Sequence, residues 1–427
     1  MKKVIIVLLL VSFIVLAACS SGSDDASSGG EVDKITVWAW DPNFNIRALN
    51  LAKDVYVSVD GDLEIEIVEN AQDDIIQRLN TSLSSGTNTG LPNIVLIEDY
   101  RAQSFLQAYP DAFHKITGSF DTDDFAPYKL SPTSLDGENY GLPFDTGVTG
   151  MYVRTDYLAA AGYTVEDVTN IDWNQYIEIG KAVKEATGKH MITLDPNDLG
   201  IIRMMIQSSG SWYVKEDGST PDIDGNEALA EAFATYKELI EADLVKPISD
   251  WSQFVSGFNN GDVATVVTGN WITPSVKAED SQSGNWAVVP QPKMAGMANS
   301  VNASNLGGSS WYVLDIDGKE QATDFLAKTF GSNIELYQKF VTEIGAMGTY
   351  LPAAKGDAYQ VEDDFFGGQT ILADFSNWSE AIPQVNFGLH TYAIEDILVV
   401  EMQNYLNGKD VNEALADAHR QAEAQIK

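Results

Sequence analysis

The sequence predicts an α/β protein with two lobes or domains, built from repeated strand-then-helix units. Three observations lead to this fold class. Short apolar segments with strand periodicity alternate with longer segments of helical periodicity. The roughly 395 residues that follow the N-terminal leader exceed what one hydrophobic core usually organises. At 44% apolar and 10% aromatic residues, the chain can build more than one core.

The N-terminus has the pattern of a secretion and lipidation signal. A Met-Lys-Lys start precedes an apolar run from Val4 to Ala18 that only Ser12 interrupts. As a helix this run would rise about 22 Å, short of the ~30 Å hydrocarbon core, so a signal peptide fits better than a membrane-spanning helix. The run ends in Leu-Ala-Ala-Cys19, which resembles a bacterial lipobox. An ordinary signal peptide with a chance cysteine and an uncleaved anchor are the alternatives.

We therefore expect residues 1–18 to be a signal peptide and Cys19 to be the lipidated, palmitate-bearing N-terminus of the mature protein. Residues 19–31 are mostly Ser, Gly and Asp and predict a flexible tether. Two or more acyl chains would anchor the protein stably to a cell membrane.

Charge and cysteine content narrow the function. The net charge of −36 argues against nucleic acid, anionic polymers and direct adhesion to anionic lipid. The single cysteine is the lipidation candidate, so no disulfide is expected in the folded part.

The predicted elements follow in order along the chain. The first half of the pattern comprises a strand at 35–40, a helix at 45–57, a strand at 63–67, a helix at 75–83 and a strand at 94–97. The last of these is continuously apolar, as in a parallel strand buried on both faces.

The second half continues the alternation. It comprises helices at 174–187 and 226–242, a strand at 263–267, a helix pair at 319–330 and 333–345, and a polar helix at 404–427. Asp172 is the expected N-cap of the first of these helices and Gly188 its C′ residue.

Motifs for catalysis and metal binding are lacking in the sequence. The four histidines have no metal-ligand spacing, and we expect His114, His190, His390 and His419 to be structural or exposed. No nucleophile elbow, phosphate-binding loop or dinucleotide fingerprint occurs. We expect no catalytic residue, no metal and no cofactor.

Aromatic residues recur beside polar residues at the ends of predicted strands. Ligands of open α/β sheets bind at the carboxyl ends of strands, so these groups can converge. Aromatic faces pack on the apolar C–H patches of sugars, while carboxylates and amides bond to hydroxyls, so this combination indicates a carbohydrate site. Three other tryptophans, Trp38, Trp173 and Trp286, we expect to be structural.

Three segments resemble the extracellular solute-binding proteins of family 1, which serve carbohydrate importers of the ATP-binding-cassette type. They are 38–45 (Trp-Ala-Trp-Asp-Pro-Asn-Phe-Asn), 91–101 (Leu-Pro-Asn-Ile-Val-Leu-Ile-Glu-Asp-Tyr-Arg) and 258–264 (Phe-Asn-Asn-Gly-Asp-Val-Ala) continuing to Trp271. The order of elements is similar to that of maltose-binding proteins. The overall pattern looks most like the lactose/arabinose-type and other oligosaccharide-binding members.

The resemblance implies a two-lobed, periplasmic-binding-protein-like fold of type II, with a ligand cleft between lobes joined by a hinge. By this analogy one lobe takes 32–145 plus 306–348 and the other 146–305 plus 349–427. The protein would be a monomer and no enzyme. It would capture a neutral mono- or oligosaccharide outside the cytoplasm, on a membrane of Gram-positive type, and deliver it to the membrane permease subunits.

The resemblance also assigns cleft residues one position at a time. These are Trp40, Asp41, Glu98, Asp99, Asp145, Asn270 and Trp271. Asp198 falls where relatives have a polar and aromatic sugar contact, but no aromatic residue occurs in this stretch here. Residue type and position alone add Trp212, Trp251, Trp311 and Trp378 as candidates.

Two other functions fit the same residues. A secreted glycoside hydrolase also uses paired carboxylates and aromatic residues. A binding protein for a non-sugar solute is the second alternative. An anionic ligand would require a cation in the cleft, and only Arg101 lies near the predicted set, so the sequence favours a neutral ligand.

Overall fold

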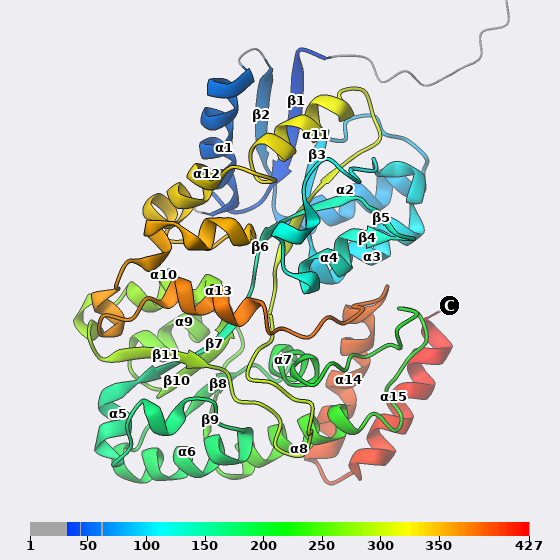
Figure 1. The fold of residues 1–427 in the computed structure, drawn as a ribbon. Coiled ribbons are helices and arrows are strands. Elements are labelled where there is room, and N and C mark those ends of the chain that lie inside the picture. The colour runs from blue at the N-terminus through cyan, green and yellow to red at the C-terminus, as the bar shows by residue number, and fades with distance from the viewer. Residues whose placement is uncertain (1–31, 43, 61–62, 427) are drawn as a thin grey trace, which may run out of the picture.

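The computed structural model describes residues 32–42, 44–60 and 63–426. The predicted signal peptide (1–18), Cys19 and the tether (19–31) lie outside the described residues. Within them, no helix combines the length and the apolar character needed to cross a membrane. Figure 1 shows the described chain as two parts, one above the other, each with its own sheet.

The first sheet has five strands in the order β2-β1-β3-β12-β6. Its strands are β1 (Lys34–Ala39), β2 (Glu64–Glu69), β3 (Ile94–Glu98), β6 (Gly141–Asp145) and β12 (Ser309–Val313). The first three are parallel, because α1 (Asn45–Asp60) and α2 (Gln72–Ser84) return the chain to the same edge each time. β12 enters from far along the chain and runs antiparallel to β3 and β6.

The second sheet has three antiparallel strands in the order β10-β7-β11. They are β7 (Thr149–Arg154), β10 (Thr265–Gly269) and β11 (Trp286–Pro290), and all three are buried along their full length. A separate parallel pair, β8 (Ile192–Leu194) and β9 (Val245–Pro247), lies beside it and contacts β10.

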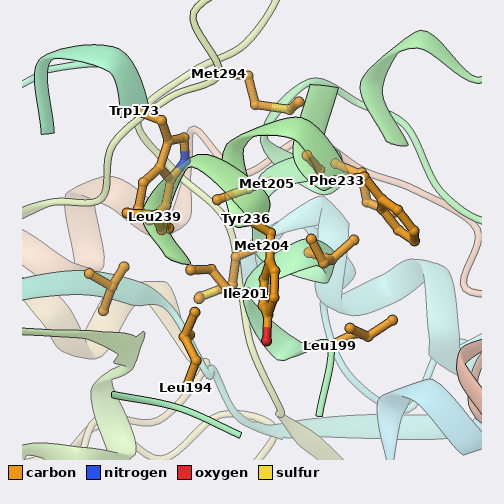
Figure 2. Packing of buried hydrophobic residues seen from close by; sticks show 14 of the residues in the cluster. Trp173, Leu194, Leu199, Ile201, Met204, Met205, Phe233, Tyr236, Leu239 and Met294 are labelled. Atoms are coloured by element: carbon orange, nitrogen blue, oxygen red, sulfur yellow. The ribbon is translucent and has the colours of Figure 1, made fainter. Parts of the chain in front are cut away.

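The core of the lower part surrounds α7 (Gly200–Ser208), a helix buried on every side. Figure 2 shows Met204 and Met205 of this helix among Trp173, Phe233 and Leu239. α6 (Trp173–Thr187) and α8 (Glu227–Glu241) contribute many of the apolar side chains that pack around it.

The predicted ends of α6 are confirmed. The Asp172 side chain accepts a hydrogen bond from the backbone N–H of Gln175, whose side chain bonds back to Asp172. Gly188 adopts the left-handed conformation that terminates the helix. The burial of Trp38, Trp173 and Trp286 confirms their structural role.

The remaining elements cover the sheets and the ends of the cores. They are α3 (Asp99–Ala108), α4 (Pro127–Thr133), β4 (Ser134–Leu135), β5 (Glu138–Asn139), α5 (Thr155–Ala160), α9 (Trp251–Asn259), α10 (Thr273–Lys277), α11 (Lys319–Lys328), α12 (Ile334–Lys339), α13 (Ile371–Ser379), α14 (Thr391–Leu406) and α15 (Val411–Gln425).

The predicted helix at 404–427 is wrong at its N-terminal end. The structure has two helices there, α14 and α15, which pack against each other. Gly408 has a φ of 104°, which ends α14, and the Asp410 side chain caps the first turn of α15. The polar pattern of 404–427 hid this break because both helices present polar faces to solvent.

The chain passes between the two parts in three places that lie side by side. β6 leads directly into β7, and isolated antiparallel bridges join Asp145 to Gly348 and Val148 to Asn305. Figure 1 shows these connecting strands between the upper and lower sheets. Few residues would need to change conformation for one part to rotate against the other.

Candidate functional site

A cavity of about 590 Å³ is lined from both sheets. On the side of the first sheet, Trp40 follows β1, Glu98 ends β3, Asp145 ends β6 and Ser309 begins β12. The opposite wall comes from β8, β10 and the start of α7. The carboxyl ends of the parallel strands thus meet at this cavity, as predicted from strand order.

A second cavity of about 650 Å³ lies on the other side of the same tryptophans. It shares Trp40, Asp145, Trp251 and Trp271 with the first cavity and adds Asp41 and Asn270. Together the two cavities bring eight of the twelve candidate side chains to one cleft. These are Trp40, Asp41, Glu98, Asp145, Asp198, Trp251, Asn270 and Trp271.

Trp251 and Trp271 form an aromatic pair in this cleft. Their ring centroids are 5.8 Å apart, and the rings are 56% and 37% exposed. The indole Nε1–H of Trp271 donates a hydrogen bond to the carbonyl of Leu306 at 2.9 Å, which fixes the orientation of the Trp271 ring. Trp251 packs against Phe254. Exposed aromatic surface rimmed by polar groups marks a ligand-binding groove.

Asp145 lies at the junction of the two cavities. Its carboxylate accepts hydrogen bonds from the backbone N–H of Ser309 at 2.5 Å and from the Ser309 hydroxyl at 3.1 Å. Burial raises the pKa of Asp145 to about 6, and the Lys129 ammonium partly opposes this rise. Asp145 lines both cavities, so its side chain borders the cleft from each of them.

Glu98, which lines the first cavity, contacts Tyr392 of α14. The tyrosine hydroxyl lies 2.9 and 2.8 Å from the two carboxylate oxygens. Burial raises the pKa of Glu98, and the hydrogen bond from Tyr392 counters part of that rise.

Asp99 is not among the residues that line the two cavities. Its side chain is only 1% exposed, accepts from the buried Lys129 ammonium and from the Ser310 hydroxyl, and is shielded from the cavity. Lys129 also donates to the carbonyl of Ser309 at 3.2 Å. Asp99 therefore supports the cleft floor from below, because it follows β3 and turns inward where Glu98 turns outward.

Trp311 and Trp212 are not among the residues that line the two cavities. Trp311 is fully buried and packs on Phe144 at 5.0 Å, because its position on β12 faces the core of the first part. Trp212 is buried as well, and its Nε1–H donates to the carbonyl of Phe387 at 3.1 Å. It borders a separate hollow that the cleft residues do not line.

Trp378 is likewise outside the set that lines the two cavities. It is half-buried and packs edge-on against Phe375, with ring centroids 5.2 Å apart. It belongs to α13 and packs against the buried cluster that includes residues of the second sheet, so its role as a ligand contact stays a prediction from residue type.

Arg203 is the main cleft residue that the sequence analysis missed. It lines the first cavity from α7, and its guanidinium donates to Glu395 at 2.5 Å and to Asp198 at 3.4 Å. An arginine inside an otherwise apolar run is a detectable signal, since buried arginines are almost always paired. Its partner Glu395 lies 192 positions away, so the pair itself is not readable from the sequence.

Apolar side chains complete the wall. Leu194, Ile248 and Phe254 line the first cavity, and Phe44 and Met347 the second. Among the described residues, no three histidine, cysteine or carboxylate side chains gather as a metal ion would require.

Comparison with known proteins gives consistent results. Residues 58–366 match the family model described as bacterial extracellular solute-binding protein. A lactose-binding protein of Rhizobium radiobacter is 44% identical over 92% of this chain and 93% of its own length. An arabinooligosaccharide-binding protein of Halalkalibacterium halodurans is 24% identical over 84% and 78%, respectively.

The fold comparison agrees with the sequence comparison. The solved structure of the sugar-binding protein MalE from Xanthomonas citri has a TM-score of 0.76 at 16% identity, covering 92% of this chain and 96% of that one. The predicted two-lobed fold is confirmed by this likeness. The hydrolase alternative is set aside, because the matched family consists of binding proteins and not of enzymes. The chain belongs to the bacterial extracellular solute-binding protein family.

Proposed function

We propose that this protein captures a neutral sugar in the cleft and delivers it to the permease of an ATP-binding-cassette importer. The observation that carries the proposal is the convergence of Trp40, Trp251 and Trp271 with Glu98 and Asp145 on one cleft. The tryptophans provide faces for the C–H patches of a pyranose, and the carboxylates accept protons from its hydroxyls.

Lactose or a related oligosaccharide is the first ligand to consider. The relative with 44% identity is a lactose-binding protein, and the similarity extends over nearly the whole of both chains. The two cavities are each within the ~300–1,000 Å³ that small-molecule sites occupy, so they accommodate an oligosaccharide.

The charges in the cleft favour a neutral ligand. Arg203 is the cation that lines the first cavity, and Glu395 and Asp198 already bind it. Arg47 lines the second cavity. Glu98 and Asp145 add negative charge at the cleft surface, which would repel a phosphate or carboxylate group.

The ligand would act by stabilising the closed arrangement of the lobes. We take the lobes as 32–145 plus 306–348 and 146–305 plus 349–427, since the crossings at Asp145 and Asn305 fall at these boundaries. A sugar that contacts both walls favours closure by as much as its affinity differs between the open and closed states.

Titration calorimetry with lactose, arabinooligosaccharides and maltooligosaccharides tests the proposal. We expect binding without turnover for at least one of these sugars, together with a smaller radius of gyration in solution scattering. If no neutral sugar binds at millimolar concentration, while a sugar acid or sugar phosphate does, the proposal of a neutral ligand is wrong.

The anchoring of the protein forms a separate part of the proposal. Cys19 would carry diacylglycerol and hold the monomeric protein outside the cytoplasmic membrane, with 19–31 as the tether, as in a Gram-positive cell. Mass spectrometry of the membrane fraction should detect the lipid on the N-terminal peptide. Cys19→Ser should release the protein into the medium, and retention of this variant on the membrane would refute the lipid anchor.

A further inference from the structure

A hydrogen bond between Glu98 and Tyr392 joins the two parts of the protein beside the first cavity. Glu98 ends β3 of the first sheet and lines the cavity. Tyr392 belongs to α14 and packs on the core around α7. The tyrosine hydroxyl is within 2.9 Å of both oxygens of the Glu98 carboxylate, so one donor fixes the plane of the whole group.

The ring of Tyr392 is itself held in place. The Arg101 guanidinium carbon lies 4.3 Å from its centroid, and that of Arg203 lies 5.6 Å away. Tyr100 packs against it edge-on at 6.4 Å. These contacts come from both sides of the cleft, since Arg101 and Tyr100 belong to α3 and Arg203 to α7.

The surroundings leave Glu98 dependent on this one donor. The Nε of Arg101 is 3.6 Å from the carboxylate, beyond hydrogen-bond distance, and Arg203 is bound to Glu395. The charged and titratable groups that face Glu98 are Asp99, Tyr100, Arg101, Arg203, Tyr392 and Glu395. Among the described residues, only Tyr392 donates a hydrogen bond to the Glu98 side chain.

We propose that Tyr392 is a positioning residue for sugar binding, which acts through Glu98 and couples that contact to the arrangement of the two sides. An ionised carboxylate offers about four lone-pair sites, and the single O–H of Tyr392, shared between the two oxygens, lies on one side of the group. The outer lone pairs are then held toward the cavity, where ligand hydroxyls donate to them. This inference rests on the proposed function of the same cleft.

The coupling follows from the placement of the two residues. Rotation of one side against the other would pull the hydroxyl away from Glu98, so the carboxylate would be aligned only in arrangements that keep the pair together. The ligand contact and the Glu98–Tyr392 contact therefore strengthen each other, in the reciprocal way that linkage requires.

Tyr392→Phe tests the inference because it removes only the hydroxyl and keeps the ring on Arg101. We expect lactose, or whichever panel sugar the wild type binds, to bind about tenfold more weakly, the scale of a lost hydrogen bond to a charged group. Tyr405→Phe, near the other end of α14 and away from the cleft, is the matched control and should bind like the wild type.

A double-mutant cycle separates positioning from general weakening. In Glu98→Ala protein the additional Tyr392→Phe change should have little further effect on affinity, because its target is gone. If Tyr392→Phe weakens sugar binding equally in wild-type and in Glu98→Ala protein, the inference is overturned, whatever the effect of Tyr392→Phe on the melting temperature.

The dependence of sugar affinity on pH gives a second measurement. Since the tyrosine hydrogen bond lowers the pKa of Glu98, its loss should move the acidic decline of affinity to higher pH. An unmoved profile combined with wild-type affinity would refute the positioning role while leaving sugar capture intact. Absence of sugar binding to the wild type would instead refute the proposed function itself.

Discussion

Replacing Lys129 by methionine should destabilise the protein strongly, because it leaves the Asp99 carboxylate buried without its cation. Both side chains are essentially inaccessible, at 0% and 1% exposure. Removing one partner of such a pair costs about 3–5 kcal/mol of unfolding free energy. The free energy of unfolding of a typical protein is only ~5–15 kcal/mol, so this single change should remove a large fraction of it.

Urea unfolding followed by circular dichroism at pH 7 measures the loss. The Lys129→Met/Asp99→Asn double variant should regain most of it, because two neutral groups of similar size replace the pair. Lys181→Met is the control, since Lys181 pairs with Glu178 on the exposed face of α6 and should change stability little.

The pH dependence of the loss has a definite sign. Burial raises the pKa of Asp99, and without Lys129 it should rise further. A carboxyl whose folded-state pKa lies above its unfolded value stabilises the fold below that unfolded value, and this contribution disappears as the pH rises through the folded pKa. The deficit of Lys129→Met should thus shrink at acidic pH. A loss below about 1 kcal/mol, or a double variant no more stable than the single one, would refute this account.

Three further outcomes are expected from the cleft. Trp251→Ala should weaken sugar binding by about 1 kcal/mol, roughly fivefold in Kd. The melting temperature of the empty protein should be nearly unchanged because Trp251 is 56% exposed. A large fall in the melting temperature would mean that the ring is structural. Protonation of Asp145 should add a fall in sugar affinity as the pH drops below about 6, separate from the fall due to Glu98, and Asp145→Asn should remove only the Asp145 component in a calorimetric pH series. Gly308→Ala should lower the free energy of unfolding, measured in urea, by about 1–3 kcal/mol, because φ is +98° and the new Cβ would lie 2.9 Å from an Asp99 oxygen. Gly118→Ala is the control and should lower it less, because φ is +80° there but the space around the glycine is open.

The local elements were largely predictable because each depends on its own periodicity. The apolar run of 94–97 became β3, and the capped segment after Asp172 became α6 almost to the residue. The break at Gly408 was missed because a single glycine is compatible with a continuing helix until the packing of α14 on α15 is known.

The site was predictable where strand order alone places the residue. Trp40 and Asp145 follow from their positions at strand ends. Placement was not predictable where the position along a strand decides it. Ser309 and Trp311 lie two positions apart on β12 and so share a face, yet the first meets the cleft at the end of the strand and the second fills the core. The point at which a strand leaves the core for the cleft depends on tertiary packing, which the periodicity of the sequence does not contain.

The arrangement of charge beneath the cleft bears on the choice of ligand as much as the tryptophans do. Lys129 and Asp99 cancel each other below the floor, and Arg203 is bound by Glu395 on the opposite wall. Glu98 and Asp145 line the first cavity as acceptors of hydrogen bonds, and Arg47 lines the second cavity. Under the proposed function, a ligand of the first cavity donates hydrogen bonds to these carboxylates and presents apolar patches to the tryptophans. A sugar would meet both conditions, whereas an anionic solute in the first cavity would face two carboxylates and the field of a chain with net charge −36.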